Sequence, residues 1–182
     1  MKRVSAPEAV ELCEVNALFI PENGAFPNHP RWPLLIYRQA LPLDYPDPAA
    51  GVEALFKSNG WHGAWRDGIY SFHHFHSNAH EVLGCCRGSA SVLFGGPHGY
   101  RLNLRAGDAV LLPAGTAHKR VEASRDFMVV GAYPGDADYD MCYGKPGENE
   151  AAARNIASVP LPERDPLFGK KGGLRSLWKA HA

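Results

Sequence analysis

The sequence predicts a single all-β domain, folded as a sandwich or a barrel. Its 182 residues are enough for one well-packed domain and too few for two. Fifteen prolines and nineteen glycines imply many turns, which favours short strands over a helical bundle. Between Ile69 and Tyr133, short apolar or alternating runs recur at the spacing that is typical of sandwiches and barrels.

The core of the domain is expected in residues 61–135, where the strand signals are clearest. The predicted strands are residues 69–75, 82–86, 90–94, 100–104, 109–112 and 126–133. Turn residues separate these runs, and residues 95–99, with three glycines and a proline, give the strongest turn signal. Strands at this spacing suggest a sandwich or a barrel.

Residues 1–60 are expected to form an N-terminal arm and one helix that pack on the barrel. The arm contains short apolar runs that are separated by prolines, which indicates short strands or wrapping segments. In the helix, Asp47 can cap the first turn, Pro48 suits the first position, and residues 59–60, Asn-Gly, can end it. Val52 lies on its apolar face together with two other large side chains.

Residues 136–182 are expected to form a polar tail that wraps the same domain. Short helices are predicted near residues 148–156 and 173–180.

Charge and composition limit the classes of partner. The formal net charge is zero and no basic stripe appears, so neither nucleic acid nor an anionic membrane is an expected partner. The N-terminus lacks the apolar run of a signal peptide, and no stretch reaches transmembrane length. The four cysteines have no C-x-x-C spacing, which fits reduced thiols in the cytoplasm. A small-molecule ligand is the expected partner.

Three histidines and one glutamate are spaced to hold a metal ion. His74 and His76 are two residues apart, so in an extended chain they point to the same side. Glu81 begins the next predicted strand, and His118 follows a later turn. His80 could replace Glu81, but strand alternation lets only one of them point inward. Imidazoles with one carboxylate suit Fe, Mn, Ni, Co or Zn, and the sequence does not choose among these divalent metals.

The spacing of these residues resembles the two signature motifs of the cupin superfamily. The matching residues are Gly68, His74, His76, Glu81 and Gly88 in the first motif, and Gly107, Pro113, Gly115 and His118 in the second. The second motif departs at its last position, where Glu122 stands in place of the usual Asn. More narrowly, the chain is similar almost end to end to the YjlB-like bacterial single-domain cupins. This resemblance implies a jelly-roll barrel (a double-stranded β-helix), often dimeric, with a metal inside.

Several further residues are candidates for roles at this site. Glu122 lies four residues after His118 and on the same parity could reach the pocket as a proton acceptor. Tyr133 could place a phenol near the metal, and these two are the candidate catalytic residues. Cys85 is expected as a small buried hydrophobe rather than a catalytic thiol. Trp61 and Trp65 could line the pocket mouth or pack against the helix.

The leading functional hypothesis is a metalloenzyme that uses dioxygen to cleave a small oxygenated substrate able to chelate the metal. One alternative is a non-redox isomerase or decarboxylase, in which Glu122 or Tyr133 moves a proton. Another is a metabolite-binding or sensing module without turnover. A homodimer is expected, because the apolar arm at residues 16–46 must cover something.

Overall fold

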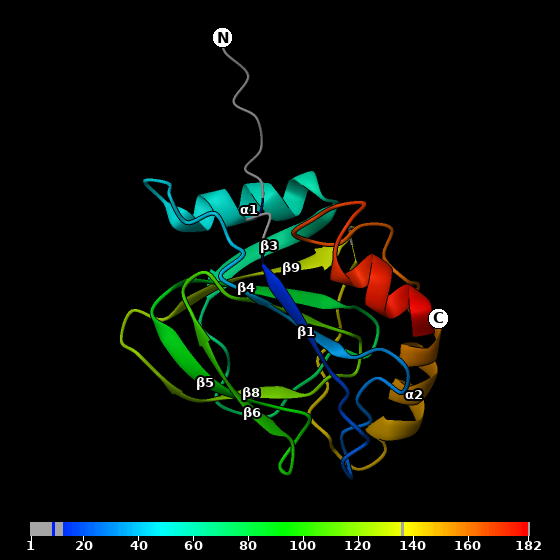
Figure 1. Cartoon of the computed structure of the whole chain (residues 1–182). Coiled ribbons are helices and arrows are strands. Elements are labelled where there is room, and N and C mark those ends of the chain that lie inside the picture. Colours follow the sequence, from blue (N-terminus) through cyan, green and yellow to red (C-terminus); the bar gives the residue numbers. More distant parts are fainter. Residues whose placement is uncertain (1–8, 10–12, 136, 182) are drawn as a thin grey trace.

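The chain folds into two antiparallel β-sheets that face each other and close into a jelly-roll barrel, the double-stranded β-helix (Figure 1). The computed structural model describes residue 9, residues 13–135 and residues 137–181. The larger sheet has the strand order β1-β2-β7-β4-β9-β3, and the smaller has the order β6-β5-β8. The strands are β1 (Glu14–Leu18), β2 (Leu34–Arg38), β3 (Trp61–Asp67), β4 (Glu81–Arg87), β5 (Ser89–Phe94), β6 (Tyr100–Arg105), β7 (Ala109–Leu112), β8 (His118–Ala123) and β9 (Met128–Pro134).

Most of the predicted strands are confirmed within one or two residues, but one expected strand is wrong and one observed strand was not predicted. Residues 69–75 were expected to form a strand, and the strand in this part of the chain is instead β3, which ends at Asp67. Residues 68–80 cross the mouth of the barrel and make only isolated bridges, such as His74 with His118. The second difference is β8, a strand that the sequence did not indicate because its residues are mostly polar and charged.

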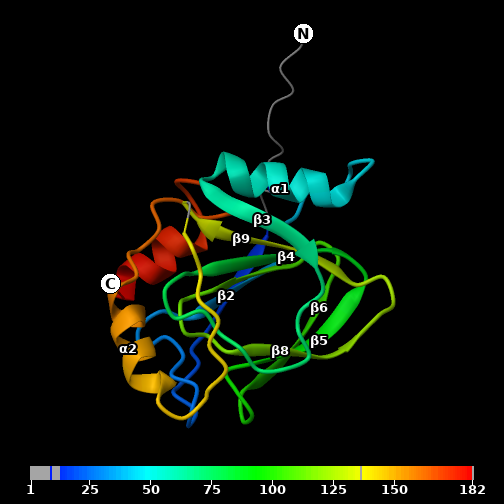
Figure 2. The same ribbon diagram turned by 180° about the vertical axis from the view of Figure 1, so that it is seen from behind.

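The predicted first helix is confirmed as α1 (Pro48–Ser58), which lies across the outer face of the larger sheet (Figure 2). The carboxylate of Asp47 accepts a hydrogen bond from the backbone N–H of Ala49 at 3.2 Å, so the expected cap is present. Close packing on β4 depends on Gly84, because a Cβ there would lie 3.0 Å from side-chain atoms of Val52 and Phe56.

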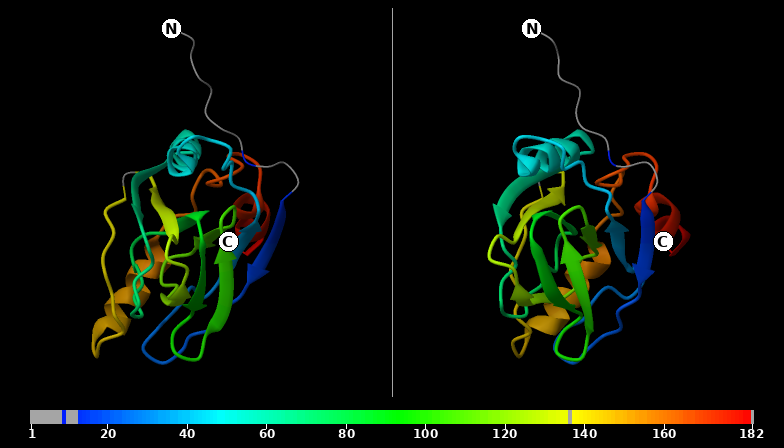
Figure 3. Two further views of the ribbon diagram at one scale, coloured as in Figure 1. Left: turned by 90° about the vertical axis from the view of Figure 1, so that its left-hand side faces the viewer. Right: turned by 60° about the vertical axis from the view of Figure 1, so that its left-hand side comes forward.

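The C-terminal residues cover one flank of the barrel. They form α2 (Glu148–Ser158) and two short helical turns, η1 (Leu174–Trp178) and η2 (Lys179–His181). These helices lie side by side on one flank in Figures 1 and 2, and Figure 3 shows them from two further directions. Trp178 is fully buried, stacks on Trp32 with ring centroids 5.2 Å apart, and donates a hydrogen bond to the carbonyl of Pro33. Within the described residues, no helix combines the length and the apolar character needed to span a membrane.

Apolar side chains pack on both faces of the larger sheet. Cys86 belongs to the cluster between the sheet and α1, whereas Cys85 and Leu83 belong to the cluster inside the barrel. This alternation confirms the expectation that Cys85 faces inward and is buried. Leu83 also lines a cavity. It therefore lies at the boundary between the packed interior of the barrel and the open space beside Glu81.

Candidate metal centre

A cavity of about 230 Å³ opens at one end of the barrel and contains all four predicted ligands. His74 and His76 come from the irregular segment 68–80, while Glu81 and His118 are the first residues of β4 and β8. All four side chains are at least 95% buried. Residues that are 44 positions apart in the sequence therefore meet in one enclosed space.

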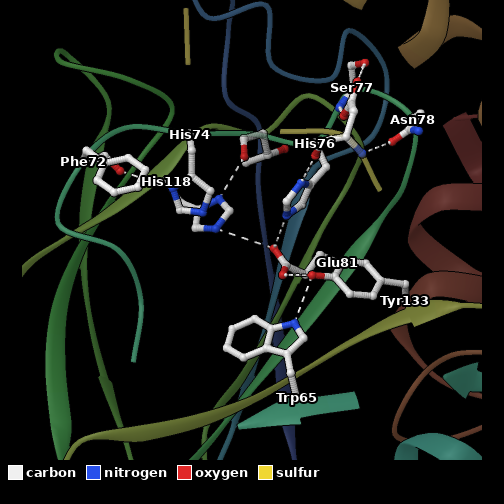
Figure 4. A network of polar contacts seen from close by, with 11 residues as sticks. Trp65, Phe72, His74, His76, Ser77, Asn78, Glu81, His118 and Tyr133 are labelled. Carbon is white, nitrogen blue, oxygen red and sulfur yellow. Dashed lines mark hydrogen bonds and ion pairs between the residues drawn. The ribbon is translucent and has the colours of Figure 1, made fainter. Parts of the chain in front are cut away.

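The four side chains point toward one another (Figure 4). The carboxylate oxygen Oε2 of Glu81 lies 3.6 Å from Nε2 of His76 and 3.5 Å from Nε2 of His118. The rings of His74 and His118 have centroids 4.1 Å apart. In the part of the chain that the structure describes, no three or more His, Cys, Asp or Glu side chains lie close enough together to be identified as a metal site from their mutual distances alone.

Backbone carbonyls fix the tautomer of each histidine. Nδ1 of His74, His76 and His118 lies 3.2, 2.5 and 3.2 Å from the carbonyl oxygens of Phe72, Asp140 and Thr116, respectively. Because a carbonyl oxygen only accepts hydrogen bonds, each Nδ1 must carry the proton. A neutral ring in this tautomer has its lone pair on Nε2, and such a partner on the other nitrogen is what orients metal-binding histidines.

Glu81 carries an unpartnered oxygen. Its Oε2 is buried and has no hydrogen-bond partner, which is costly for a carboxylate oxygen. Burial by itself would raise the pKa of Glu81, but the imidazoles of His76, His118 and His74 hold that pKa down at about 2. An ionised carboxylate with one free oxygen aimed at imidazole nitrogens is suited to a cation.

The pKa values of two of the three histidines, His74 and His118, favour neutral rings, whereas that of His76 does not. Burial lowers the pKa of His118 to about 3, with a further contribution from His74, and burial also lowers the pKa of His74. The pKa of His76 is raised although burial opposes this, because the charge of Glu81 outweighs it. Neutral imidazoles and an ionised carboxylate are the protonation states that metal ligands require.

Tyr133 and Trp65 stand behind the carboxylate. The hydroxyl of Tyr133 donates to Oε1 of Glu81 at 3.0 Å, and the indole Nε1 of Trp65 donates to the hydroxyl oxygen of Tyr133 at 2.9 Å. Burial raises the pKa of Tyr133 far above its ordinary value, and the charge of Glu81 adds to this, so the phenol keeps its proton. Tyr133 thus reaches the predicted site, as expected.

Residues 137–143, which we call the strap, cover the other side of the cavity. Tyr139 stacks on Tyr133 with centroids 4.3 Å apart, and Met141 also lines the space. The carboxylate of Asp140 accepts hydrogen bonds from the backbone N–H and the hydroxyl of Ser77. The strap is therefore tied to the segment that carries His76, whose Nδ1 proton it also accepts.

Glu122 does not reach the cavity, and this expectation is wrong. Its side chain is 75% exposed and pairs with Arg101 at 3.2 Å. A β-bulge explains the change, because Ser91 pairs with Glu122 while the next residue of β5 pairs with Arg120, which leaves Val121 unpaired. One extra residue reverses the alternation of β8, so Glu122 lies on the outer face.

The other candidates are separated by the fold. His80 is fully buried on the opposite face from Glu81, where its Nδ1 accepts from the backbone N–H of Ala114. Trp61 packs in the cluster beneath α1, whereas Trp65 lines the cavity. Sequence reasoning missed the strap altogether, and no local signal connects it with His76, which lies more than 60 residues away.

Comparison with known proteins identifies the family. No family model matches the chain. The uncharacterised protein YjlB of Bacillus subtilis is 41% identical over 165 residues, which is 91% of this chain and 97% of that protein. The chain belongs to the YjlB-like cupins. The resemblance expected from the two motifs is therefore confirmed.

Solved structures with similar folds are more distant. The lyase for DMSP, DddQ of Ruegeria pomeroyi, is 21% identical with a TM-score of 0.36, over 74% of this chain and 53% of the lyase. A double-stranded β-helix protein of Klebsiella pneumoniae is 14% identical with a TM-score of 0.35, over 77% and 89%. An 11S allergen of Cocos nucifera is 23% identical with a TM-score of 0.38, and this chain spans 31% of its length. At these scores the activity of this YjlB-like cupin has to be argued from its own cavity.

Proposed function

We propose that this YjlB-like cupin binds one divalent transition metal through His74, His76, Glu81 and His118 and acts as an enzyme on a small oxygenated molecule. The observation that carries the proposal is the buried, unpartnered Oε2 of Glu81, which faces Nε2 atoms 3.5–3.6 Å away. This separation is too long for a hydrogen bond, yet it suits two ligand atoms that each lie about 2.1 Å from one ion. The group is thus a good fit for Fe, Mn, Ni, Co or Zn.

The shape of the cavity limits the substrate to a small molecule. Its volume of about 230 Å³ lies below the range of roughly 300–1,000 Å³ that holds drug-sized ligands. The walls are largely aromatic, with Trp65, Tyr70, Tyr133 and Tyr139 among the lining residues. A compact apolar or aromatic body with oxygen atoms at one end matches such walls and leaves the polar end for the metal.

The charge around the cavity favours an uncharged substrate. Arg66 is the cationic residue of the lining, but its guanidinium is bound by Asp47 at 2.7 Å and by Glu53 at 2.6 Å, on the side of the sheet where α1 lies. Asp67 and Glu81 add negative charge to the lining. Because the positive charge is already paired, a free carboxylate or phosphate on the substrate gains little from the protein.

The chemistry supplied by a bound metal would be Lewis-acid polarisation of the substrate and, for a redox-active ion, reaction with dioxygen. The protein would contribute ligand orientation, aromatic walls that exclude water, and a closed end formed by Leu83. We place oxidative cleavage ahead of isomerisation or decarboxylation. The latter reactions need a proton carrier, yet Glu122 lies outside the cavity and the hydroxyl of Tyr133 is engaged in donating a hydrogen bond to Glu81.

Metal analysis tests the binding step. We expect elemental analysis of untagged protein to find about one divalent metal per chain, and Glu81→Gln and His118→Gln to weaken binding by at least about 100-fold. His98→Gln is the matched control, because His98 is an exposed histidine on a turn away from the cavity. Equal metal content in wild type and in both site variants would reject the proposed ligands.

Turnover separates the candidate functions. Protein loaded with Fe(II) is expected to consume dioxygen with at least one member of a panel of uncharged diols, catechols and β-diketones. Turnover that persists with Zn(II) under anaerobic conditions would point to isomerisation or decarboxylation instead. A tightly held metabolite with no turnover under either condition would support a binding or sensing module.

A further inference from the structure

Three residues on three adjacent strands form a hydrogen-bonded line that ends at the candidate metal centre. Glu81 is on β4, Tyr133 on β9 and Trp65 on β3, and these strands are neighbours in the larger sheet. The indole of Trp65 lies 2.9 Å from the hydroxyl of Tyr133, which lies 3.0 Å from Oε1 of Glu81. Figure 4 shows the three side chains in sequence, with Trp65 farthest from the histidines.

The chemistry of the donors sets the direction of the line. An indole N–H can only donate, so the oxygen of Tyr133 must accept from Trp65. An ionised carboxylate can only accept, so the single proton of the Tyr133 hydroxyl is directed to Glu81. Because the oxygen of Tyr133 accepts from Trp65, the hydroxyl proton of Tyr133 has a single acceptor, which is Oε1 of Glu81.

The backbone is shaped to allow this line. Trp65 pairs with Gly131 across β3 and β9, and a Cβ at Gly131 would lie 2.2 Å from atoms Cε2 and Cζ2 of the indole. Any side chain other than hydrogen would therefore displace the ring. A bulge between His62 and Trp65, with Gly63 at a φ of +63°, turns Trp65 to the cavity side of the sheet.

We propose that Trp65 and Tyr133 form a positioning relay that holds Glu81 with Oε1 occupied and only Oε2 presented to the histidines. This inference rests on the proposed metal site. A carboxylate held in this way binds a metal through one oxygen, which leaves a coordination position free that a two-oxygen mode would fill. Tyr133 is then a positioning residue, not the proton carrier that the sequence hypothesis considered.

Hydrogen bonds to a metal-binding carboxylate commonly change metal affinity by 10–100-fold, which makes the relay measurable without any substrate. Tyr133→Phe keeps the ring that stacks on Tyr139 and removes the donor to Glu81. Trp65→Phe removes the donor to Tyr133 and leaves that phenol free to rotate. We expect Tyr133→Phe to lower Mn(II) affinity about 10–100-fold and Trp65→Phe about 3–10-fold.

A double-mutant cycle distinguishes a relay from two separate structural effects. If Trp65 acts only through Tyr133, the double variant should match Tyr133→Phe alone in Mn(II) affinity, rather than show the product of the two losses. X-ray absorption of the Co(II) form should show one more carboxylate oxygen around the metal in Tyr133→Phe than in wild type. Tyr100→Phe is the matched control, since Tyr100 is an exposed tyrosine on β6 and is not among the residues that line the cavity; its Mn(II) affinity should change less than twofold.

The outcomes separate the relay from the metal site itself. Wild-type protein that binds no Mn(II) or Co(II) overturns both the proposed function and the relay. Wild type that binds while Tyr133→Phe binds equally well, or a double variant in which the losses multiply, overturns the relay alone. If circular dichroism shows that Tyr133→Phe does not fold, Trp65→Phe is tested instead by Mn(II) affinity and by X-ray absorption of the Co(II) form. Unchanged affinity together with an unchanged number of ligand atoms around Co(II) in Trp65→Phe refutes the relay.

Discussion

The cavity has two walls that are built in different ways. One, the sheet wall, consists of side chains from β3, β4 and β9, including Trp65, Glu81 and Tyr133. The other, the loop wall, consists of residues from the segment 68–80 and the strap. The turn at residues 113–117 supports this wall from behind, where the N–H of Gly115 donates to the carbonyl of His76. The sheet wall is fixed by ladder pairing between its strands, whereas the loop wall is held by isolated bridges and side-chain contacts.

The candidate metal centre therefore combines a rigid side with an adjustable one. Glu81 sits in a ladder with β7 and is backed by the relay, so its direction is set by the sheet register. His76 depends on a carbonyl from the strap and on the clasp between Ser77 and Asp140. Local openings have lower free energy where backbone hydrogen bonds are few, so substrate entry is expected through the loop wall.

The largest effect is expected from crowding the sheet wall. Gly131→Ala would place a methyl group against the indole of Trp65, and overpacking of this kind costs about 1–3 kcal/mol. Urea unfolding should show this loss, and Mn(II) affinity should fall as in Trp65→Phe. Gly68→Ala is the matched control in the loop wall, because a Cβ there meets nothing within 4 Å. Equal stability of the two variants would show that the walls do not differ in packing.

A smaller effect is expected from loosening the loop wall. Ser77→Ala removes the hydroxyl that donates to Asp140 and accepts from Asn155, in a fully buried position. Loss of such contacts should cost about 1–2 kcal/mol in urea unfolding and speed hydrogen exchange in the strap. Ser158→Ala removes an exposed serine hydroxyl from the end of α2 and should change neither quantity appreciably. Hydrogen exchange in the strap that is as slow in Ser77→Ala as in the wild type would show that the contact between Ser77 and Asp140 does not hold the strap in place.

Acid should weaken the support of the loop wall through His29. Burial lowers the pKa of His29 to about 4, with a contribution from Arg31, and its Nδ1 accepts from the backbone N–H of Trp32 at 2.9 Å. The ring of His80 also faces His29, with centroids 6.3 Å apart. Neighbouring Asn28 holds the turn at residues 113–117 by accepting from the N–H of Ala117.

Because the pKa of His29 is lower in the folded chain than its ordinary value of 6.5, the unfolded chain binds the proton more readily. This contribution to stability is complete above about pH 6.5 and is lost as the pH falls toward 4, by on the order of 1 kcal/mol. His29→Asn keeps an acceptor and does not titrate, so its unfolding free energy should fall less over this range. Parallel pH profiles for the two proteins would contradict the assignment.

The smallest effect is expected for Glu122, which belongs to neither wall. Its pair with Arg101 is solvent-exposed, and such pairs contribute roughly 0–1 kcal/mol. Glu122→Gln should therefore leave Mn(II) affinity and turnover unchanged, with stability within about 0.5 kcal/mol. A large loss of turnover in this variant would restore Glu122 as a catalytic candidate and refute the role of the bulge in β8.

The fold class, the capped helix and the four residues that meet in the cavity could all be predicted from the sequence. These features follow from local rules, namely a cap residue before a proline, apolar runs between turns, and the two-residue period that places His74 and His76 on one side. His118 could be included because its spacing after the turn matched the resemblance to a family. The fold then brought it to within 3.5 Å of Glu81.

Which other side chains join the site depends on how the strands pair in the folded chain, and in particular on two β-bulges. In β3 the bulge turns Trp65 toward the cavity, away from the face that holds Trp61, while in β8 the bulge turns Glu122 outward. A bulge arises from how two strands pair, so one extra residue reverses the alternation that a single strand predicts. The contact between His76 and the carbonyl of Asp140 is likewise non-local, since no pattern within either segment encodes a partner that lies more than 60 residues away.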